Sequence, residues 1–266
     1  RMASFLPQRL FRRKNSEPAV TVSEENGIRS LYLGTDTIQS SMRLSAPAEL
    51  VLTYTHAMMA SLLFTQPRRI LHIGLGGGSL PRFCHAYLPE AVNDVVELHP
   101  SVVAVARSMF ALPDDERMVV HIGDGVDFVS RAEPVYDLIF LDAFDGVDLI
   151  PAMVTEPFFH ECRMALAAHG VLAVNLWRGH KHYARHVSAL RAAFDGNVLT
   201  VPAETHGNAA ALGLTTSATP HSLRWDALDT RATALQPLGL DFAAMIAVLK
   251  RDNPHTASRL MPTERG

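Results

Sequence analysis

Two carboxylates near the middle of the chain have the types and spacing to hold a cation or an amine. Asp142 ends the apolar run YDLIFLD, and Asp145 follows three residues later, next to Gly146. An acid that directly follows a buried strand of an α/β sheet lies where such folds bind their ligands. We therefore interpret both acids as candidate reactive-site carboxylates. The simpler alternative, a solvated turn residue, applies more readily to Asp145 than to Asp142.

A glycine-rich turn lies earlier in the chain. In RILHIGLGGGS the apolar run stops at Gly74, and glycine occupies four of the five positions from 74 to 78. Glycine lets bare backbone approach a nucleotide, although a tight strand–helix turn alone could also require it. Glu97 ends the next apolar run. An acid about 20 residues beyond such a turn accepts hydrogen bonds from ribose hydroxyls, so we predict that Glu97 holds a ribose.

Asp124 stands between Gly123 and Gly125, after the run VVHI. An acid there could cap the following helix, or it could accept a hydrogen bond from the exocyclic amine of an adenine. With the glycine turn and Glu97 in register we favour adenine recognition, and the cap remains the competing interpretation. A nicotinamide dehydrogenase needs the glycines and Glu97 but neither Asp124 nor Asp142. The series therefore indicates an S-adenosyl ligand rather than a dinucleotide.

The elements that position these residues alternate between strands and helices. The sequence predicts strands over 70–74, 92–97, 118–122, 136–142, 171–176, 197–202 and 209–215. It predicts helices over 79–88, 101–110, from near 126, 155–167 and 181–194. Strands that are apolar along their whole length form a parallel sheet with both faces covered. The expected fold class is α/β, with a Rossmann-like, mostly parallel sheet.

A smaller unit precedes this sheet. VTVS, IRSLYLG and TDTIQSSM read as strands, with Asn26-Gly27 as a hairpin turn between the first two. We expect a flexible basic arm at 1–17, a small β domain at 18–46 and a linking helix at 47–66. The main domain then spans 67–253, and a frayed tail spans 254–266.

The overall composition and net charge exclude some classes of binding partner. A net charge of −3 argues against a general nucleic-acid binder, which needs a concentrated basic face. No apolar run reaches the length of a membrane span, and the basic start lacks the apolar core of a secretory signal. Cys84 and Cys162 are the only cysteines, and we expect both to be reduced thiols in the cytoplasm.

Three histidines, His180, His182 and His186, lie close together in the sequence. A metal site needs further ligands in a closed geometry, and nothing in the sequence pairs with them. We therefore expect a polar surface face and no metal. Trp177 follows the strand VLAVNL and either walls an acceptor pocket or packs in the core.

Six segments together resemble the spermidine synthase (polyamine aminopropyltransferase) family, in particular its bacterial spermidine synthase-like branch. They are LYLGTDTIQSS, RRILHIGLGGGSL, VVELHPSVVAVAR, VHIGDGVDFV, YDLIFLDAFDG and GVLAVNLW. The resemblance implies a small N-terminal β domain, a class I methyltransferase-type sheet and a homodimer. It implies transfer of an aminopropyl group from decarboxylated S-adenosylmethionine to a polyamine-like amine, with no tightly bound cofactor.

The resemblance also implies roles for individual residues. The S-adenosyl co-substrate would be bound by Gln39, Gly74, Gly76, Gly78, Glu97, Leu98, Asp124 and Gly125. Asp142 and Asp145 would meet the reacting amine, with Asp142 as the base and Asp145 orienting the amine. An alkylammonium has a pKa near 10.4, so offering its free base at neutral pH costs about 4–5 kcal/mol. A carboxylate within hydrogen-bond reach can take that proton as the nitrogen reacts.

The chain departs from the family pattern at three places. Gly77 stands where the family's glycine turn carries an aspartate expected to hold the donor's ammonium. RLSAPAELVLTY replaces the usual segment of the amine pocket, and Glu204 stands where a tyrosine of that pocket would be. A changed acceptor, a changed donor or a lost activity would each fit.

Two alternatives therefore stay open. With Gly77, Ser79 and the helix start behind it could favour the carboxylate of ordinary S-adenosylmethionine, which indicates a methyltransferase. An amine pocket whose residues differ from the family pattern would also fit a non-catalytic nucleoside-binding or scaffold protein.

Overall fold

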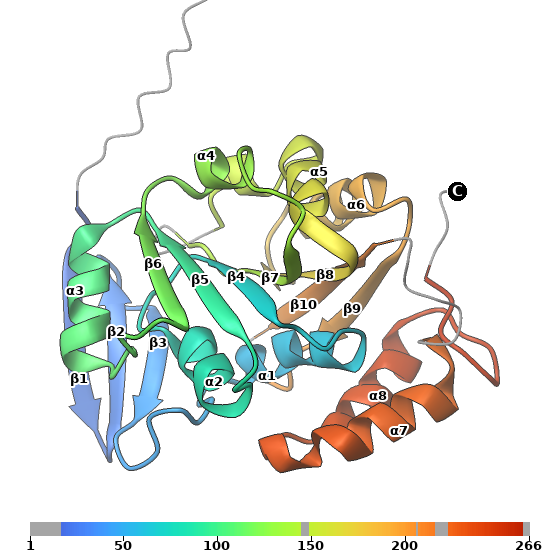
Figure 1. The fold of residues 1–266 in the computed structure, drawn as a ribbon, viewed down its shortest axis with the longest axis horizontal. Helices are drawn as coiled ribbons and strands as arrows, with labels where there is room; N and C mark the ends of the chain where they lie inside the picture. The colour runs from blue at the N-terminus through green and yellow to red at the C-terminus, as the bar shows by residue number, and fades with distance from the viewer. Residues whose placement is uncertain (1–16, 145–148, 206, 216–222, 263–266) are drawn as a thin grey trace, which may run out of the picture.

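The computed structural model describes residues 17–144, 149–205, 207–215 and 223–262, which form two sheets with helices around them (Figure 1). The smaller sheet is antiparallel, with strands β1 (Val20–Glu25), β2 (Ile28–Leu33) and β3 (Ile38–Arg43) in that order. Asn26 and Gly27 join β1 to β2 with φ of 51° and 75°. Two consecutive positive φ angles are typical of the tight turn that matches strand twist, so the predicted hairpin is confirmed.

The larger sheet has seven strands in the order β6-β5-β4-β7-β8-β10-β9. Their bounds are β4 Arg69–Ile73, β5 Val92–Glu97, β6 Met118–Ile122, β7 Tyr136–Leu141, β8 Leu166–Trp177, β9 Val198–Pro202 and β10 Asn208–Leu214. The strands from β6 to β8 run parallel, whereas β10 runs antiparallel to both of its neighbours. The predicted α/β class with a mostly parallel sheet is confirmed.

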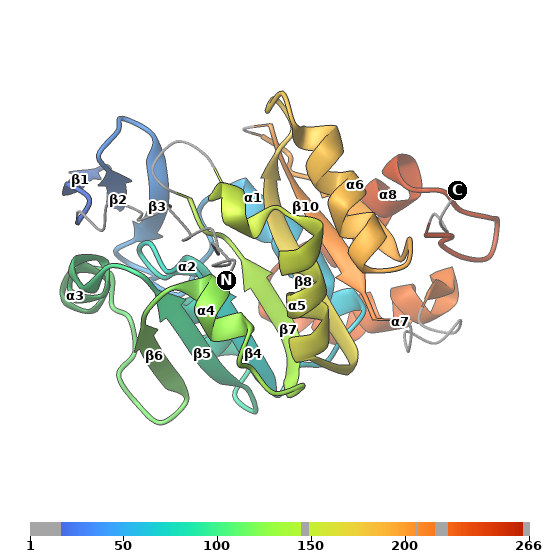
Figure 2. The ribbon, with the colours of Figure 1, turned by 90° about the horizontal axis from the view of Figure 1, so that it is seen from above.

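Helices cover both faces of this sheet. One face carries α1 (Thr53–Met59), its 3₁₀ extension η1 (Ala60–Leu63), α2 (Ser79–Tyr87), α7 (Trp225–Leu235), η4 (Gln236–Leu238) and α8 (Phe242–Asp252). The opposite face carries α4 (Gly125–Val129), η2 (Pro151–Met153), α5 (Glu156–Ala165) and α6 (Tyr183–Ala193). Figure 2 shows α4, α5 and α6 in this order across that face, with α5 over β7 and β8.

The strand periodicity explains why both faces are apolar. In β4, Ile70 packs into the core under α1 and α2, whereas Leu71 and Ile73 pack into the core under α4 and α5. Successive side chains of a strand point to opposite faces, so a strand covered on both faces must be apolar throughout. His72 is the polar exception on this strand and is 1 % exposed.

Helix α3 (Pro100–Met109) joins the two sheets. Val102, Val103 and Ala106 pack against Val95 of β5. Phe110, which follows the helix, packs against Leu31 and Met42 of the small sheet. Figure 1 shows α3 lying beside β1 and β2. The small sheet is thereby held next to the strand ends that carry the glycine turn.

The helix expected to open at Pro47 begins only at Thr53. The intervening residues turn back from β3, where Arg43 bridges to Ala46 and pairs with Glu49 at 2.7 Å. Leu50 is buried and packs in the same core as Ala57 and Met58 of α1. The domain division at these residues stays a prediction.

Two helices, α7 and α8, are not among the elements predicted from the sequence. Their buried residues repeat at helical spacing, for example Trp225, Leu228, Ala232 and Leu235 in α7. The expectation of a frayed end is also wrong for its described part, 254–262. Leu260 is fully buried and its N–H donates to the carbonyl of Leu223 at 2.8 Å, because the segment pairs with the start of α7.

Candidate active site

Asp142 follows β7 and is held by two side-chain donors. The Tyr54 hydroxyl donates to Oδ2 at 2.9 Å, and the Asn175 amide donates to Oδ1 at 2.9 Å. Asn208 donates in turn to Oδ1 of Asn175 at 2.9 Å, which fixes the orientation of that amide. Burial raises the pKa of the Asp142 carboxyl above its ordinary value, and the two hydrogen bonds oppose that shift. The result is a fixed carboxylate with an elevated proton affinity.

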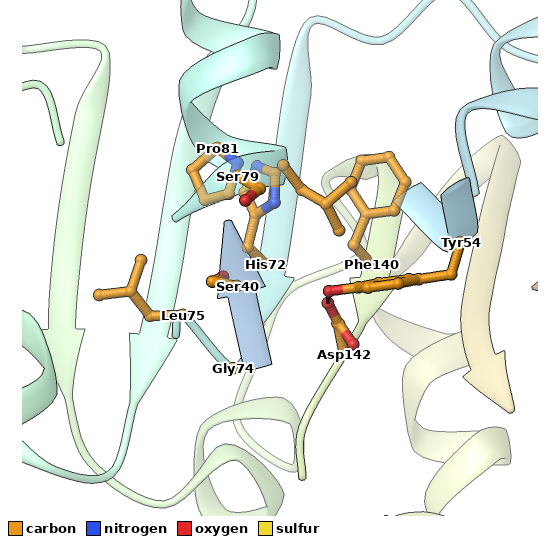
Figure 3. A pocket seen from close by; sticks show the side chains of 10 residues that line it. Ser40, Tyr54, His72, Gly74, Leu75, Ser79, Pro81, Phe140 and Asp142 are labelled. Atoms are coloured by element: carbon orange, nitrogen blue, oxygen red, sulfur yellow. Dashed lines mark hydrogen bonds between the residues drawn. The ribbon is translucent and has the colours of Figure 1, made fainter. Parts of the chain in front are cut away.

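Tyr54 is a site residue that the sequence reading missed. Its position in the helical pattern of 47–64 indicates a residue on an apolar face. In the structure α1 aims the hydroxyl at Asp142, from the face of the sheet opposite to α4 and α5 (Figure 3). Burial and the neighbouring negative charge both raise the pKa of the Tyr54 phenol, so it stays protonated and donates. The only sequence signal was the tyrosine itself, whose hydroxyl needs a hydrogen-bond partner when it is buried.

The glycine turn lies directly against Asp142. Gly74 has φ of 90°, and a Cβ there would overlap the backbone carbonyl oxygen of Asp142. The Gly74 N–H donates to the carbonyl of Val96 at 2.9 Å, and the Asp142 N–H donates to Ile73 at 3.0 Å. Only glycine allows three strand ends to approach this closely. Gly76 and Gly78 also lie in this turn, both with positive φ.

Glu97 lies at the end of β5 and is 8 % exposed. One carboxylate oxygen accepts from the Leu75 N–H at 3.1 Å, and the other accepts from the His99 N–H at 2.9 Å. Burial raises the pKa of the Glu97 carboxyl, while backbone donors including Leu98 oppose the shift. Glu97 therefore ties the glycine turn to β5, and its role as a ribose ligand stays a prediction.

Asp124 caps α4. Its Oδ1 accepts from the Val126 N–H at 2.8 Å. The helix cap, which was the alternative interpretation of Asp124, is therefore observed in the structure. Adenine recognition by Asp124 stays a prediction. Gly125 packs tightly beneath it, because a Cβ would lie 2.8 Å from Ile73 and 2.9 Å from Met153.

The remaining predicted residues lie around the same strand ends. Gln39 is on β3 of the small sheet, and its backbone carbonyl lies 3.5 Å from the Tyr54 hydroxyl. Leu98 follows Glu97 and is half-buried. Asp145 lies outside the described residues.

A small cavity lies between Asp142, Tyr54 and the glycine turn (Figure 3). Gly74, Leu75 and Asp142 line it from the strand ends, and Tyr54 lines it from α1. Ser40, His72, Ser79, Leu80, Pro81 and Phe140 complete the lining. The chain thus brings its glycine turn, a fixed carboxylate and the small sheet to one polar cavity.

The space around Gly77 does not accommodate the aspartate that the family carries at this position. A Cβ at this position would lie 2.9 Å from both Phe110 and the Ser40 side chain. Phe110 is fully buried between the two sheets and has no room to yield. A carboxylate on this residue would therefore require the small sheet to shift.

The three histidines do form a cluster. The His180 ring lies 5.3 Å from His186 and 5.4 Å from His182, measured between ring centroids. Across the ranges that the structure describes, no group of three or more His, Cys, Asp or Glu side chains has the geometry to hold a metal ion. Trp177 ends β8 beside this cluster and is 47 % exposed, so it is not a core residue.

The segment around Glu204 approaches α1. The Thr205 hydroxyl lies 2.7 Å from the hydroxyl of Thr53, the residue before Tyr54. Glu204 itself is exposed. Glu204 is therefore adjacent in sequence to a residue that contacts the first residue of α1, the helix that carries Tyr54.

Comparison with known proteins assigns the family. A family model described as a spermine/spermidine synthase domain matches residues 52–192. The polyamine aminopropyltransferase of Neisseria meningitidis is 44 % identical over 258 residues, covering 96 % of this chain and 97 % of that protein. The chain belongs to the spermine/spermidine synthase family. The resemblance stated from the sequence segments is therefore confirmed.

Solved structures of the family and its neighbours share the fold. A probable spermidine synthase from Corynebacterium glutamicum matches 91 % of this chain and 95 % of its own, with a TM-score of 0.67 and 17 % identity. Human methyltransferase-like protein 13, solved in complex with SAH, matches 70 % of this chain and 91 % of its own. Its TM-score is 0.62 and its identity is 29 %. Within the described ranges, no helix of this family member is long and apolar enough to cross a membrane.

Proposed function

We propose that the chain transfers an aminopropyl group from decarboxylated S-adenosylmethionine to a polyamine-like amine. The observation that carries this proposal is Asp142, a buried carboxylate held by Tyr54 and Asn175 against the glycine turn in a member of this family. The name of the Neisseria meningitidis relative, a polyamine aminopropyltransferase, supports the same reaction.

In the proposed site the nucleoside lies along the carboxyl ends of β4, β5 and β6. Glu97 accepts from the ribose hydroxyls, and Asp124 accepts from the adenine amine while it caps α4. Backbone at Gly74, Gly76 and Gly78 approaches the sulfonium side, with Leu98 and Gly125 beside the nucleoside and Gln39 closing from the small sheet. These strand ends form the edge at which open α/β sheets bind their ligands.

The proposed chemistry is an in-line displacement. The amine nitrogen forms a bond to the donor carbon next to sulfur, the carbon–sulfur bond breaks, and methylthioadenosine leaves with the electron pair. Asp142 accepts the proton that the nitrogen gives up. Burial favours this role, because the raised pKa of Asp142 makes it a stronger base than an exposed carboxylate.

The acceptor site is proposed to use the acids around α1. Asp145 orients the reacting amine, and Glu204 takes the place of a pocket tyrosine and receives a distal ammonium. An acidic residue near Thr53 suits a polycationic acceptor, since a carboxylate attracts an ammonium group. We further propose that the enzyme is a cytoplasmic homodimer, and light scattering after size-exclusion chromatography measures its mass.

A direct incubation tests the reaction. Purified protein is mixed with decarboxylated S-adenosylmethionine and a short diamine, and products are measured by mass spectrometry. We expect methylthioadenosine and the aminopropylated amine in equal amounts. Neither product appearing, at any diamine length, would sink the proposal.

A methyltransferase is the second candidate, because Gly77 offers no carboxylate to the donor's ammonium. The same incubation with ordinary S-adenosylmethionine separates the two. A methylated amine together with S-adenosylhomocysteine would identify the methyltransferase. Absence of binding by any adenosyl ligand in calorimetry would leave only a scaffold role.

A further inference from the structure

His72 is a buried polar residue on a strand whose other inward positions are apolar. It lies in β4, two residues before Gly74, and its ring stacks on Phe140 with centroids 5.4 Å apart. Its Nε2 lies 2.9 Å from Oδ1 of Asn93. The Asn93 amide nitrogen faces the carbonyl of Arg117 at 3.4 Å, which orients Oδ1 toward the histidine. This network assigns the proton of His72 to Nε2.

The assigned tautomer leaves Nδ1 as an acceptor. Nδ1 is buried and, among the described residues, has no hydrogen-bond partner. An unsatisfied buried polar atom destabilises the folded protein, so its presence calls for an occupant or a function. Burial also lowers the pKa of His72 to about 4, so the ring is neutral near pH 7 and its Nδ1 lone pair is available.

His72 lines the cavity beside the reacting groups. Figure 3 shows its ring standing between Ser79 and Phe140, on the same cavity as Tyr54 and Asp142. The free volume for the centre of a water-sized group is about 10 Å³. That is room for roughly one water molecule. The cavity therefore accepts a group of the size of water or ammonium.

The charges around the cavity select between ligand groups. Asp142 is the carboxylate among its lining residues, and the hydroxyls of Ser40 and Ser79 also line it. Arg82, the buried arginine of α2, donates hydrogen bonds to the carbonyls of Gly77 and Pro47. It does not line the cavity. Neutral acceptors and one negative charge suit a small cation.

We propose that the cavity at His72 binds the terminal ammonium of the aminopropyl donor, with Nδ1 of His72 as an acceptor that compensates for the missing carboxylate at Gly77. The inference rests on the proposed function. In that reaction the amine nitrogen lies on Asp142 and attacks the carbon next to sulfur. The donor's ammonium is two carbons farther along, within reach of the same cavity. His72 is then a specificity-determining residue that favours the decarboxylated donor.

A matched pair of variants isolates Nδ1. A glutamine amide can replace Nε2, so His72→Gln keeps the donor to Asn93 and removes the acceptor in the cavity. An asparagine amide sits where Nδ1 sits, so His72→Asn keeps an acceptor in the cavity and removes the contact with Asn93. Calorimetry measures binding of decarboxylated S-adenosylmethionine, S-adenosylmethionine and methylthioadenosine to each protein.

We expect His72→Gln to weaken binding of the decarboxylated donor about 10-fold or more, as for a lost hydrogen bond to a charged group. Methylthioadenosine has no ammonium, so its affinity should change less than about 2-fold. His72→Asn should retain most of the donor affinity. The native protein should bind the decarboxylated donor more tightly than S-adenosylmethionine, because Asp142 in the cavity lining repels the carboxylate of S-adenosylmethionine.

Three outcomes would overturn the inference. In the first, His72→Gln binds the decarboxylated donor as tightly as the native protein does, which means that the cavity holds only water. In the second, both variants lose donor and methylthioadenosine binding equally, which assigns His72 a purely structural role. In the third, His72→Asn loses the donor as strongly as His72→Gln. The proposed function fails separately, if the native protein itself neither binds nor consumes the decarboxylated donor.

Discussion

The Asp142 carboxylate is held where an ionised group is costly. Its two donors, Tyr54 and Asn175, offset part of the loss of water, yet burial still raises its pKa. A chain under selection for stability alone would place a neutral residue here. The cost is understandable if the carboxylate must accept a proton, because the same burial that destabilises its charge increases its basicity.

Asp142→Asn separates these two effects. Turnover should fall about 10²–10⁴-fold, because an amide cannot accept the proton. The free energy of unfolding should rise relative to the native protein. Because the folded-state pKa is raised, the native protein loses stability as pH rises through that pKa, and asparagine does not titrate.

Urea unfolding checks the stability at two pH values. The advantage of Asp142→Asn should be larger near neutral pH than at a pH close to the ordinary aspartate pKa of about 3.9, because the pKa of Asp142 is raised in the folded state. Unchanged turnover would remove Asp142 from the mechanism. An advantage that grows as pH falls would contradict the sign of the pKa shift.

Tyr54→Phe tests the hydrogen bond to Asp142. That bond lowers the pKa of Asp142, so its loss should raise the pKa further and move the acid limb of the kcat/KM–pH profile to higher pH. Tyr32→Phe, in β2 of the small sheet, is the matched control and should leave the limb in place. An acid limb that stays fixed in Tyr54→Phe would show that the limb reports another group.

Among the secondary-structure elements, the start of α4 assigns two roles to one side chain, Asp124. Asp124 caps the helix through the Val126 N–H, and the same carboxylate is proposed to read adenine. Helix caps and ligand acceptors are both built at strand ends, so the two roles do not exclude each other. Substitutions can nevertheless separate them.

Asparagine caps a helix about as well as aspartate, but it replaces one acceptor oxygen by a donor. Asp124→Asn should therefore keep the melting temperature and lose affinity for methylthioadenosine. Asp124→Ala should lose the affinity and also about 1 kcal/mol of stability. Calorimetry and thermal unfolding measure the two effects, and full affinity in Asp124→Asn would reduce Asp124 to a cap.

At the scale of the whole molecule, the C-terminal helices close one face of the sheet. Leu228 of α7 and Leu249 of α8 are fully buried in the same core as Met58, Met59 and Leu62 of the α1–η1 segment. These helices therefore support the segment that aims Tyr54 at Asp142. They act on the site through packing, without contributing a residue to the cavity.

Leu249→Ala should lower the free energy of unfolding by about 2–5 kcal/mol, because the core around it cannot collapse fully into the space. Met164→Ala on α5 is the control. Met164 is 59 % exposed, so its loss should change stability by no more than about 0.5 kcal/mol. Denaturant unfolding measures both. A small effect of Leu249→Ala would show that α8 unfolds independently of the sheet.

The class of fold and the positions of most strands could be predicted from the amino-acid pattern alone. Apolar runs such as ILHI in 70–73 and LIFL in 138–141 lie in β4 and β7, because a central strand covered on both faces is mostly apolar. The resemblance also determined the family. Glycine at position 74 could be read as a close backbone approach, since glycine fits where a Cβ would meet Asp142.

The side chains that meet in the site could be identified only from the folded chain. Tyr54 lies 88 residues before Asp142, and Asn175 lies 33 residues after it. His72 reads as one polar residue in an apolar strand, and its orphaned acceptor follows from its packing against Asn93 and Phe140. A local pattern predicts periodicity and turns. A cavity is set by contacts between segments distant in sequence, so its polar lining became visible only in the folded chain.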